Sequence, residues 1–226
     1  MATITIGTPD GGWPKVSLEA INSSIDVAAG VTIDGVDISA HAAALDAHTK
    51  NPMEILRTGE YYIPYATKYE ALTLGANTLY AIPLLVARNM TVDRIALQVS
   101  TLADPSNIRL GIYNNGTNLY PGTLLLDAGT VSGATTGVKT ITISQALTKG
   151  IYWVVCVSDA TPAVNALGYY AEPCMILGIR STDFNHRNIG WSVAFTYAAL
   201  PDPFTVGGSI ANAFLPNMPL RLLSLD

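Results

Sequence analysis

Charged side chains are scarce in this sequence of 226 residues, in which Asp, Glu, Lys and Arg together make up 13%. That is about half of their usual share in globular proteins. Hydrophobic residues make up 49%, and the mean hydropathy is +0.32. A single domain of this length leaves much of its surface in water. Two interpretations therefore compete: the chain is embedded in a membrane, or it buries apolar surface against other protein chains.

Long hydrophobic runs are missing. A membrane-spanning helix takes about 20 mostly apolar residues, whereas the longest apolar run, 79–87, contains Pro83 and ends at Arg88. The first residues, 1–6, carry no basic segment and no apolar core of the kind that a signal peptide has. We expect no membrane partner, and we attribute the surplus hydrophobicity to contacts between protein chains.

Basic clusters and cysteine frameworks are missing too. The 12 Lys and Arg residues are scattered and the formal net charge is −5, so the sequence does not favour nucleic-acid binding through phosphate contacts. Cys156 and Cys174 form neither a disulfide framework nor a zinc-binding spacing. We expect two buried free thiols in a reducing compartment, with no metal and no cofactor.

The residues that are present divide the chain into three parts. Residues 1–36 are dense in turn formers and have no core of their own, so we expect an irregular docking segment with Trp13 as its large apolar anchor. Residues 37–52 predict one short helix, because alanines dominate it and Pro52 ends it. Residues 53–226 predict a β-rich head domain.

A seven-residue spacing marks one face of the expected helix. Ile38 and Leu45 share one heptad position, and His41 and His48 share another. Two heptads are too short for an isolated coiled coil. They are long enough for a seam between copies of a larger oligomer, and we take these four residues as a candidate oligomer seam.

The two histidines of this seam, His41 and His48, allow three interpretations. In the first, they form stacked imidazole rings at the axis of a trimeric helix bundle, where they would bind water, an anion or a metal. In the second, they are exposed polar positions on a helix that packs through its alanine face. In the third, they serve in catalysis. The sequence leaves these alternatives open, although no carboxylate in the stripe supports a metal.

Ten short strands are expected in the head domain, separated by turn signals and with no competing helical periodicity. In 91–100 and 108–113, apolar and polar residues alternate, as in strands with one buried face. The stretch 151–157 is apolar on both faces and predicts a central strand between two layers. The other strands are expected at 69–74, 79–86, 124–126, 138–145, 174–179, 191–197 and 220–225.

These strands predict a mainly β fold, an antiparallel jelly-roll-like β-sandwich preceded by the irregular anchor and the short helix. The segments 181–190 and 198–219 carry Pro, Gly, Asn and aromatic residues, and we expect surface loops there. Aromatic rings near these loops are candidates for stacking on sugars. Alternatively, they fill the sandwich core or a subunit interface. The candidate glycan contacts are Tyr169, Tyr170, Phe184 and Trp191, with Tyr197 and Phe204 nearby.

Two stretches carry a resemblance to known proteins. Residues 31–48 resemble linkers in fibre and head-decoration proteins of tailed bacteriophages. The motifs at 108–114, 121–124, 137–139 and 150–153 resemble a β-sandwich module that recurs in phage tail and virion structural proteins. This resemblance implies a virion surface protein, commonly a homotrimer, with an N-terminal anchor and a C-terminal β head. It brings no catalytic residues with it.

One feature of the sequence is compatible with an enzyme. His186 is close in sequence to Asp183 in a polar loop, as a catalytic carboxylate–histidine pair would be. No nucleophile-elbow, zinc-protease or phosphate-loop motif is present. We therefore expect a non-enzymatic phage virion structural protein, a homotrimeric fibre or a capsid or tail decoration protein. It would be assembled in the host cytoplasm and would contact other virion proteins of the capsid, neck or tail. The alternative is a carbohydrate-binding protein that recognises a host surface glycan.

Overall fold

The computed structural model describes residues 32–33, 36–37, 56–63, 69–167, 176–178, 188–211 and 214–225. The chain divides into two compact units, 1–50 and 51–226. In the first unit, β1 (Thr32–Ile33) pairs antiparallel with β2 (Val36–Asp37). Asp37 therefore belongs to a strand rather than to the expected helix. The rest of that helix and the residues Trp13, Ile38, His41, Leu45 and His48 lie outside the described residues.

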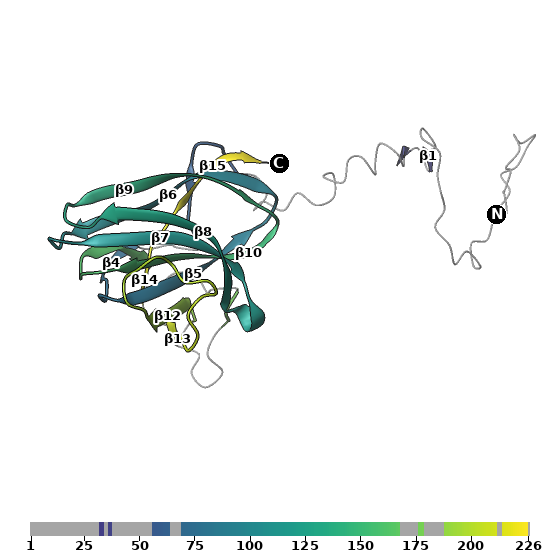
Figure 1. Cartoon of the computed structure of the whole chain (residues 1–226). Coiled ribbons are helices and arrows are strands. Elements are labelled where there is room, and N and C mark those ends of the chain that lie inside the picture. The colour runs from purple at the N-terminus through teal and green to yellow at the C-terminus, as the bar shows by residue number, and fades with distance from the viewer. Residues whose placement is uncertain are drawn as a thin grey trace, which may run out of the picture. The chain divides into compact units, whose positions relative to one another are not determined.

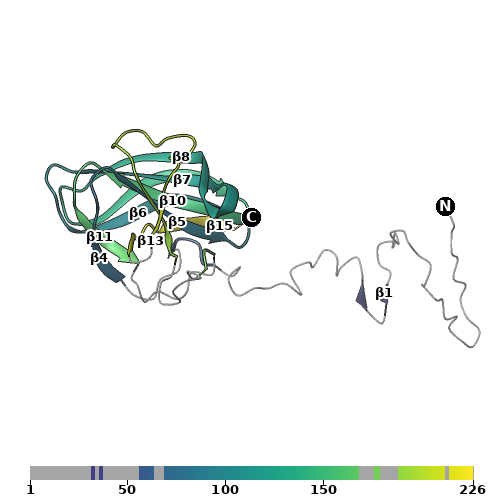
Figure 2. The ribbon, with the colours of Figure 1, turned by 90° about the horizontal axis from the view of Figure 1, so that it is seen from below.

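The second unit consists of two antiparallel sheets, which Figures 1 and 2 show from two directions. A short 3-10 turn, η2 (Thr117–Leu119), lies between β7 and β8. The six-stranded sheet contains, in spatial order, β13 (Ser209–Ala211), β12 (Gly190–Ala194), β5 (Thr78–Val86), β10 (Gly150–Ser158), β7 (Asn107–Asn115) and β8 (Pro121–Ser132). The seven-stranded sheet contains β14 (Leu215–Pro216), β11 (Ala163–Leu167), β6 (Met90–Thr101), β15 (Leu220–Leu225) and β3 (Tyr61–Tyr62), with β4 (Tyr69–Thr73) beside β11 and β9 (Gly137–Leu147) beside β6.

The strand pairing follows one nested hairpin. At its centre β7 pairs with β8, and then β6 pairs with β9, β5 with β10 and β4 with β11. Successive pairs fall alternately in the six-stranded and the seven-stranded sheet, so the folded hairpin wraps around a core between the sheets. This is the winding of a jelly roll. The prediction of a mainly β, antiparallel jelly-roll-like sandwich is therefore confirmed.

The main core lies between the two sheets and follows the two-residue alternation of the strands. On β6, for example, Ile95, Leu97 and Val99 point inward and are at most 1% exposed. On β10, Val154 and Cys156 face them from the other sheet. The prediction that Cys156 is a buried free thiol is confirmed, whereas Cys174 lies outside the described residues.

A second core covers the outer face of the six-stranded sheet. Trp153 and Val155 of β10 are fully buried there, beneath Leu200 and Phe204. Both faces of β10 are therefore covered, as the apolar stretch 151–157 predicts. The prediction of a surface loop at 198–219 holds only in part. Residues 201–208 are irregular and several of them are exposed, but Leu200 and Phe204 of the same segment are buried against the sheet, and β13 and β14 follow them.

Some strand limits also differ from expectation. The strand expected at 124–126 extends over the whole of β8, because the turn formers Asp127-Ala128-Gly129 make a bulge within it instead of a turn. Gly129 supplies the positive φ of 99° at this bulge. Where the strand 174–179 was expected, the described residues 176–178 form a turn. Strand β11 has no counterpart in the prediction, since its five residues show no clear alternation.

Candidate functional site

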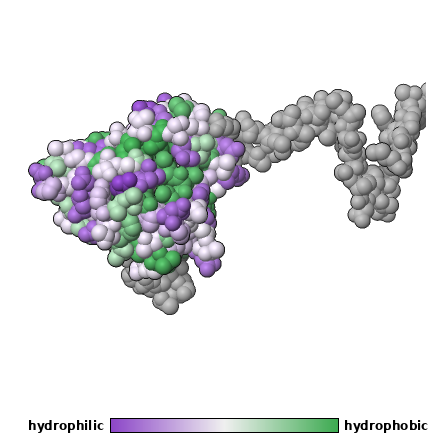
Figure 3. Space-filling model, viewed as in Figure 1, coloured by the Kyte–Doolittle hydropathy of each residue, from purple (hydrophilic) through white to green (hydrophobic). Residues whose placement is uncertain are grey.

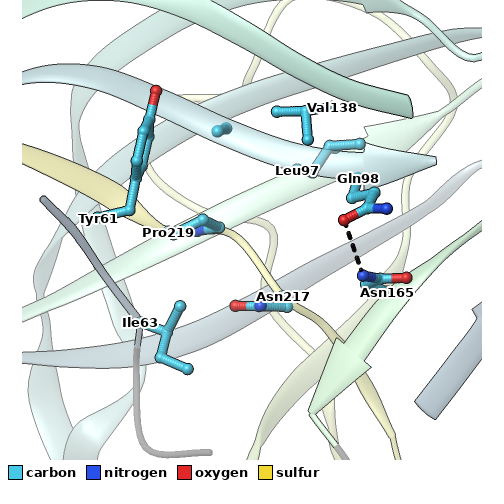
Figure 4. A pocket seen from close by; sticks show the side chains of 9 residues that line it. Tyr61, Ile63, Leu97, Gln98, Val138, Asn165, Asn217 and Pro219 are labelled. Carbon is cyan, nitrogen blue, oxygen red and sulfur yellow. Dashed lines mark hydrogen bonds between the residues drawn. The ribbon is translucent and has the colours of Figure 1, made fainter. Parts of the chain in front are cut away.

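A groove of about 540 Å³ lies on the outer face of the seven-stranded sheet, on the side away from the second core. The strand alternation that sends Leu97 and Val99 into the main core turns Gln98 outward. Gln98 is the register partner of Val138 on β9, so both side chains share the outer face. Figure 4 shows this groove from close by. Its described lining residues are Tyr61, Ile63, Ala96, Leu97, Gln98, Val138, Asn165, Asn217 and Pro219.

Three amide side chains from separate parts of the sequence meet in this groove. Asn165 of β11 donates from Nδ2 to Gln98 Oε1 at 3.1 Å, which Figure 4 marks as a dashed line. The backbone N–H of Asn217, in the link between β14 and β15, donates to the carbonyl oxygen of Asn165 at 2.8 Å. The first bond fixes the amides of Asn165 and Gln98 relative to each other, and the second holds the backbone of Asn217 beside them.

Asn217 carries the most unusual polar atom of the groove. The residue is only 6% exposed, and its Oδ1 has no hydrogen-bond partner within the part of the chain that the structure describes. A buried acceptor without a partner costs about 1–3 kcal/mol. Most buried polar side-chain atoms in folded proteins do have partners. Asn217 Oδ1 is an exception that is closed to solvent, so a donor in the groove does not reach it in this arrangement.

One end of the groove is bordered by an aromatic ring and an ion-paired cluster. Tyr61 of β3 is 40% exposed and is the register partner of Arg221 on β15. Arg221 donates from Nε to Asp93 Oδ1 at 2.8 Å and makes a second bond through Nη2, while Arg94 lies 3.4 Å from the same carboxylate. The hydrogen bond from Arg221 lowers the pKa of Asp93, and the pKa of Arg221 is raised in turn. This cluster ties β15 to β6 beside the groove.

The described groove lining itself is uncharged. It offers amide donors and acceptors, a phenol ring and apolar walls, a combination suited to binding a neutral polar molecule. Within the described ranges, no group of three or more His, Cys, Asp or Glu could hold a metal ion, and no helix is long and apolar enough to cross a membrane.

The aromatic residues proposed from the sequence do not lie at this groove where the structure describes them. Trp191 is half-buried in β12, on the opposite sheet, where its Nε1 donates to the carbonyl oxygen of Leu119 at 2.8 Å and its ring packs on Tyr120 with centroids 4.9 Å apart. Phe204 is 2% exposed in the second core, and Tyr197 shares a hydrogen bond with Thr130. Tyr169, Tyr170, Phe184, Asp183 and His186 lie outside the described residues.

The groove amides were missed by the sequence analysis. Gln98 stands out only as a polar residue in an alternating strand, and Asn217 belongs to a segment expected to be a surface loop. Their proximity depends on the pairing of strands that are far apart in sequence. Comparison of the chain with protein-family models, with curated proteins and with solved structures gives no match.

Proposed function

We propose that this chain is a non-enzymatic structural protein of a tailed-phage virion, a homotrimeric fibre or a decoration protein of the capsid or tail. The observation that carries this proposal is the division of the chain. A complete jelly roll lies within 51–226, and residues 1–50 form a separate compact unit. Jelly rolls are common in viral capsid proteins and in lectins. Of these two contexts, viral particle and lectin, the resemblance of residues 31–48 to phage linkers favours the viral particle.

In this proposal the N-terminal unit and the head have different tasks. Residues 1–36 dock the chain on another virion protein through Trp13, and the helix at 37–52 joins three copies through Ile38 and Leu45. Apolar burial between chains then stabilises the assembly in proportion to the area removed from water. His41 and His48 would lie along the same seam.

The surface of the head supports a role in assembly. Figure 3 shows patches of hydrophobic residues between polar ones on the face in view. Large apolar side chains that are more than one third exposed occur on both sheets and on the connecting segments. They include Leu85, Leu102, Val138, Val206, Ile210, Phe214 and Leu223. Contacts with neighbouring virion proteins would cover part of this apolar surface.

The virion location is tested on intact particles. Antibodies against the purified chain, carrying gold labels, are applied to phage particles produced from the genome that encodes it. The proposal expects gold at repeated positions on the particle surface. It also expects peptides of this chain among the digestion products of the purified particles. Absence of the chain from particles purified away from the cell lysate would overturn the proposal.

A further inference from the structure

We propose that β9 pairs with β9 of a second copy of this chain, antiparallel and across a two-fold axis at Thr142, so that two heads share one continuous sheet. The strand lies at the margin of the seven-stranded sheet, where β6 is the only partner it has among the described residues. Figure 1 shows it along one side of the head. This contact is additional to the proposed trimer seam and does not depend on a virion location.

The outer edge of β9 has backbone groups to offer. In a strand that is paired on one side, every second residue directs its N–H and C=O away from the sheet, where a further strand can bind them. The backbone–backbone bonds that the structure describes outside the sheets include none from residues 137–147, and one carbonyl near the end of the strand, that of Ala146, accepts from a side chain. Ile141 and Ile143 pack on the main core but are only partly buried. A second strand would therefore both satisfy backbone groups and cover apolar surface.

The other long edge strand is less suited to pairing. β8 begins with Pro121 and contains the bulge at Asp127-Ala128-Gly129, and both features hinder the addition of a strand to a sheet edge. β9 has no proline, and Lys139 is its only charged residue. Its exposed and covered residues alternate along its whole length, although its pairing with β6 contains one register shift. Among the strands that the structure describes, β9 therefore offers the most regular long edge.

The sequence of β9 is complementary to itself when two copies run antiparallel. An axis at Thr142, its middle residue, places each residue opposite one of similar chemistry in the other copy. On the exposed face Thr142 meets Thr142, Thr140 meets Ser144 and Val138 meets Ala146, and on the face toward the core Ile141 meets Ile143 and Lys139 meets Gln145. Such hydroxyl and β-branched pairs stabilise neighbouring strands. No like charges face each other in this register.

The size of the contact sets its strength. One pair of strands is small beside the roughly 1,200–2,000 Å² that a stable complex buries. The formal net charge of −5 on each chain also opposes the approach of two copies, although none of the acidic residues lies on β9. We therefore expect weak pairing in dilute solution and more complete pairing where heads are concentrated.

A disulfide across the axis tests both the pairing and its register. The full chain carries Cys174→Ser in every variant, since the remaining Cys156 is buried. Thr142→Cys brings the thiols of two copies opposite each other, with Cα atoms about 4.5–5.5 Å apart, so mild oxidation should give mainly a two-chain band on a non-reducing gel. Thr140→Cys is the matched control on the same exposed face. Its two copies would lie about 13 Å apart along the strands, so it should give little of this band, and adding Ser144→Cys should restore it.

The mass of the full chain at rising concentration, measured by light scattering, is the second test. Relative to the mass in dilute solution, whether of one chain or of three, the mass should rise to about twice that value or more. Thr142→Lys sets two like charges face to face at the axis, so it should weaken this association about fivefold or more. Thr101→Lys is the matched control, exposed at the end of β6, and it should behave as the wild type does.

Three results would overturn the inference. They are equal cross-linking of the Thr142→Cys and Thr140→Cys variants, the absence of a two-chain band from the Thr142→Cys variant, and a wild-type mass that stays constant as the concentration rises. None of them bears on the trimer seam, which the mass in dilute solution measures.

Discussion

Truncation of Phe204 is the most direct test of the second core. Phe204 is 2% exposed, and its ring meets those of Tyr113 and Tyr120 edge-on, with centroids 5.3 and 5.5 Å apart. Its backbone N–H also donates to the carbonyl oxygen of Gly122 at 2.9 Å, which fixes the segment on the sheet. A phenylalanine in such a site loses its transfer free energy and leaves a cavity when it is shortened. We therefore expect Phe204→Ala to lower the free energy of unfolding by about 3–5 kcal/mol.

The assay is urea unfolding followed by tryptophan fluorescence, because Trp153 is buried in the same core. Wild type and variants are compared at one protein concentration, since assembly would add to stability. Val206→Ala is the matched control, two residues along the same segment and 80% exposed, and it should change stability by no more than about 0.5 kcal/mol. If Phe204→Ala has an effect as small as this control, the segment is a surface loop after all and the second core is wrong.

Three further predictions concern single positions. Gly111→Ala should destabilise the head by about 1–3 kcal/mol, because an added Cβ would lie 2.6 Å from the backbone carbonyl oxygen of Leu126 and would also overlap the Leu200 side chain; an unchanged denaturation midpoint would contradict that close approach. Since Arg221 lowers the folded-state pKa of Asp93, wild type should be more stable than Asp93→Asn above about pH 5, and this advantage should fade as the pH drops through the folded-state pKa, below about 4. If the difference in stability between wild type and Asp93→Asn does not change between about pH 2 and pH 7, this pairing is refuted. Burial raises the pKa of the Cys156 thiol, so in a variant whose other cysteine is serine, a thiol reagent should react only on unfolding, and rapid labelling of the native protein would contradict the burial.

The sequence predicts the fold class well because the strands alternate clearly. Ile95, Leu97 and Val99 identify the inner face of β6, and the doubly apolar stretch 151–157 identifies β10 as the central strand. Turn formers are less reliable, since Asp127-Ala128-Gly129 makes a bulge. There the Asp127 carboxylate pairs with Arg109 and accepts the N–H of Leu200. Such long-range partners are invisible to local pattern analysis.

The groove could not be predicted, since it exists only after the sheet has formed. Gln98, Asn165 and Asn217 come from β6, β11 and the link between β14 and β15. Only the pairing of β11 with β6 and the position of the link bring their amides together. The sequence suggested aromatic rings as ligand contacts, with Phe204 near them. In the structure Phe204 packs in the second core, because a sheet that is covered on both faces needs apolar side chains over its outer face.

The assembly at the centre of the proposed function is tested by the solution mass of the full-length chain, measured by light scattering on a sizing column. The account predicts a mass near three times 23.9 kDa, and a return to the single-chain mass when Ile38 and Leu45 are both replaced by Asp. A mass near 23.9 kDa for the wild type would contradict the trimer seam.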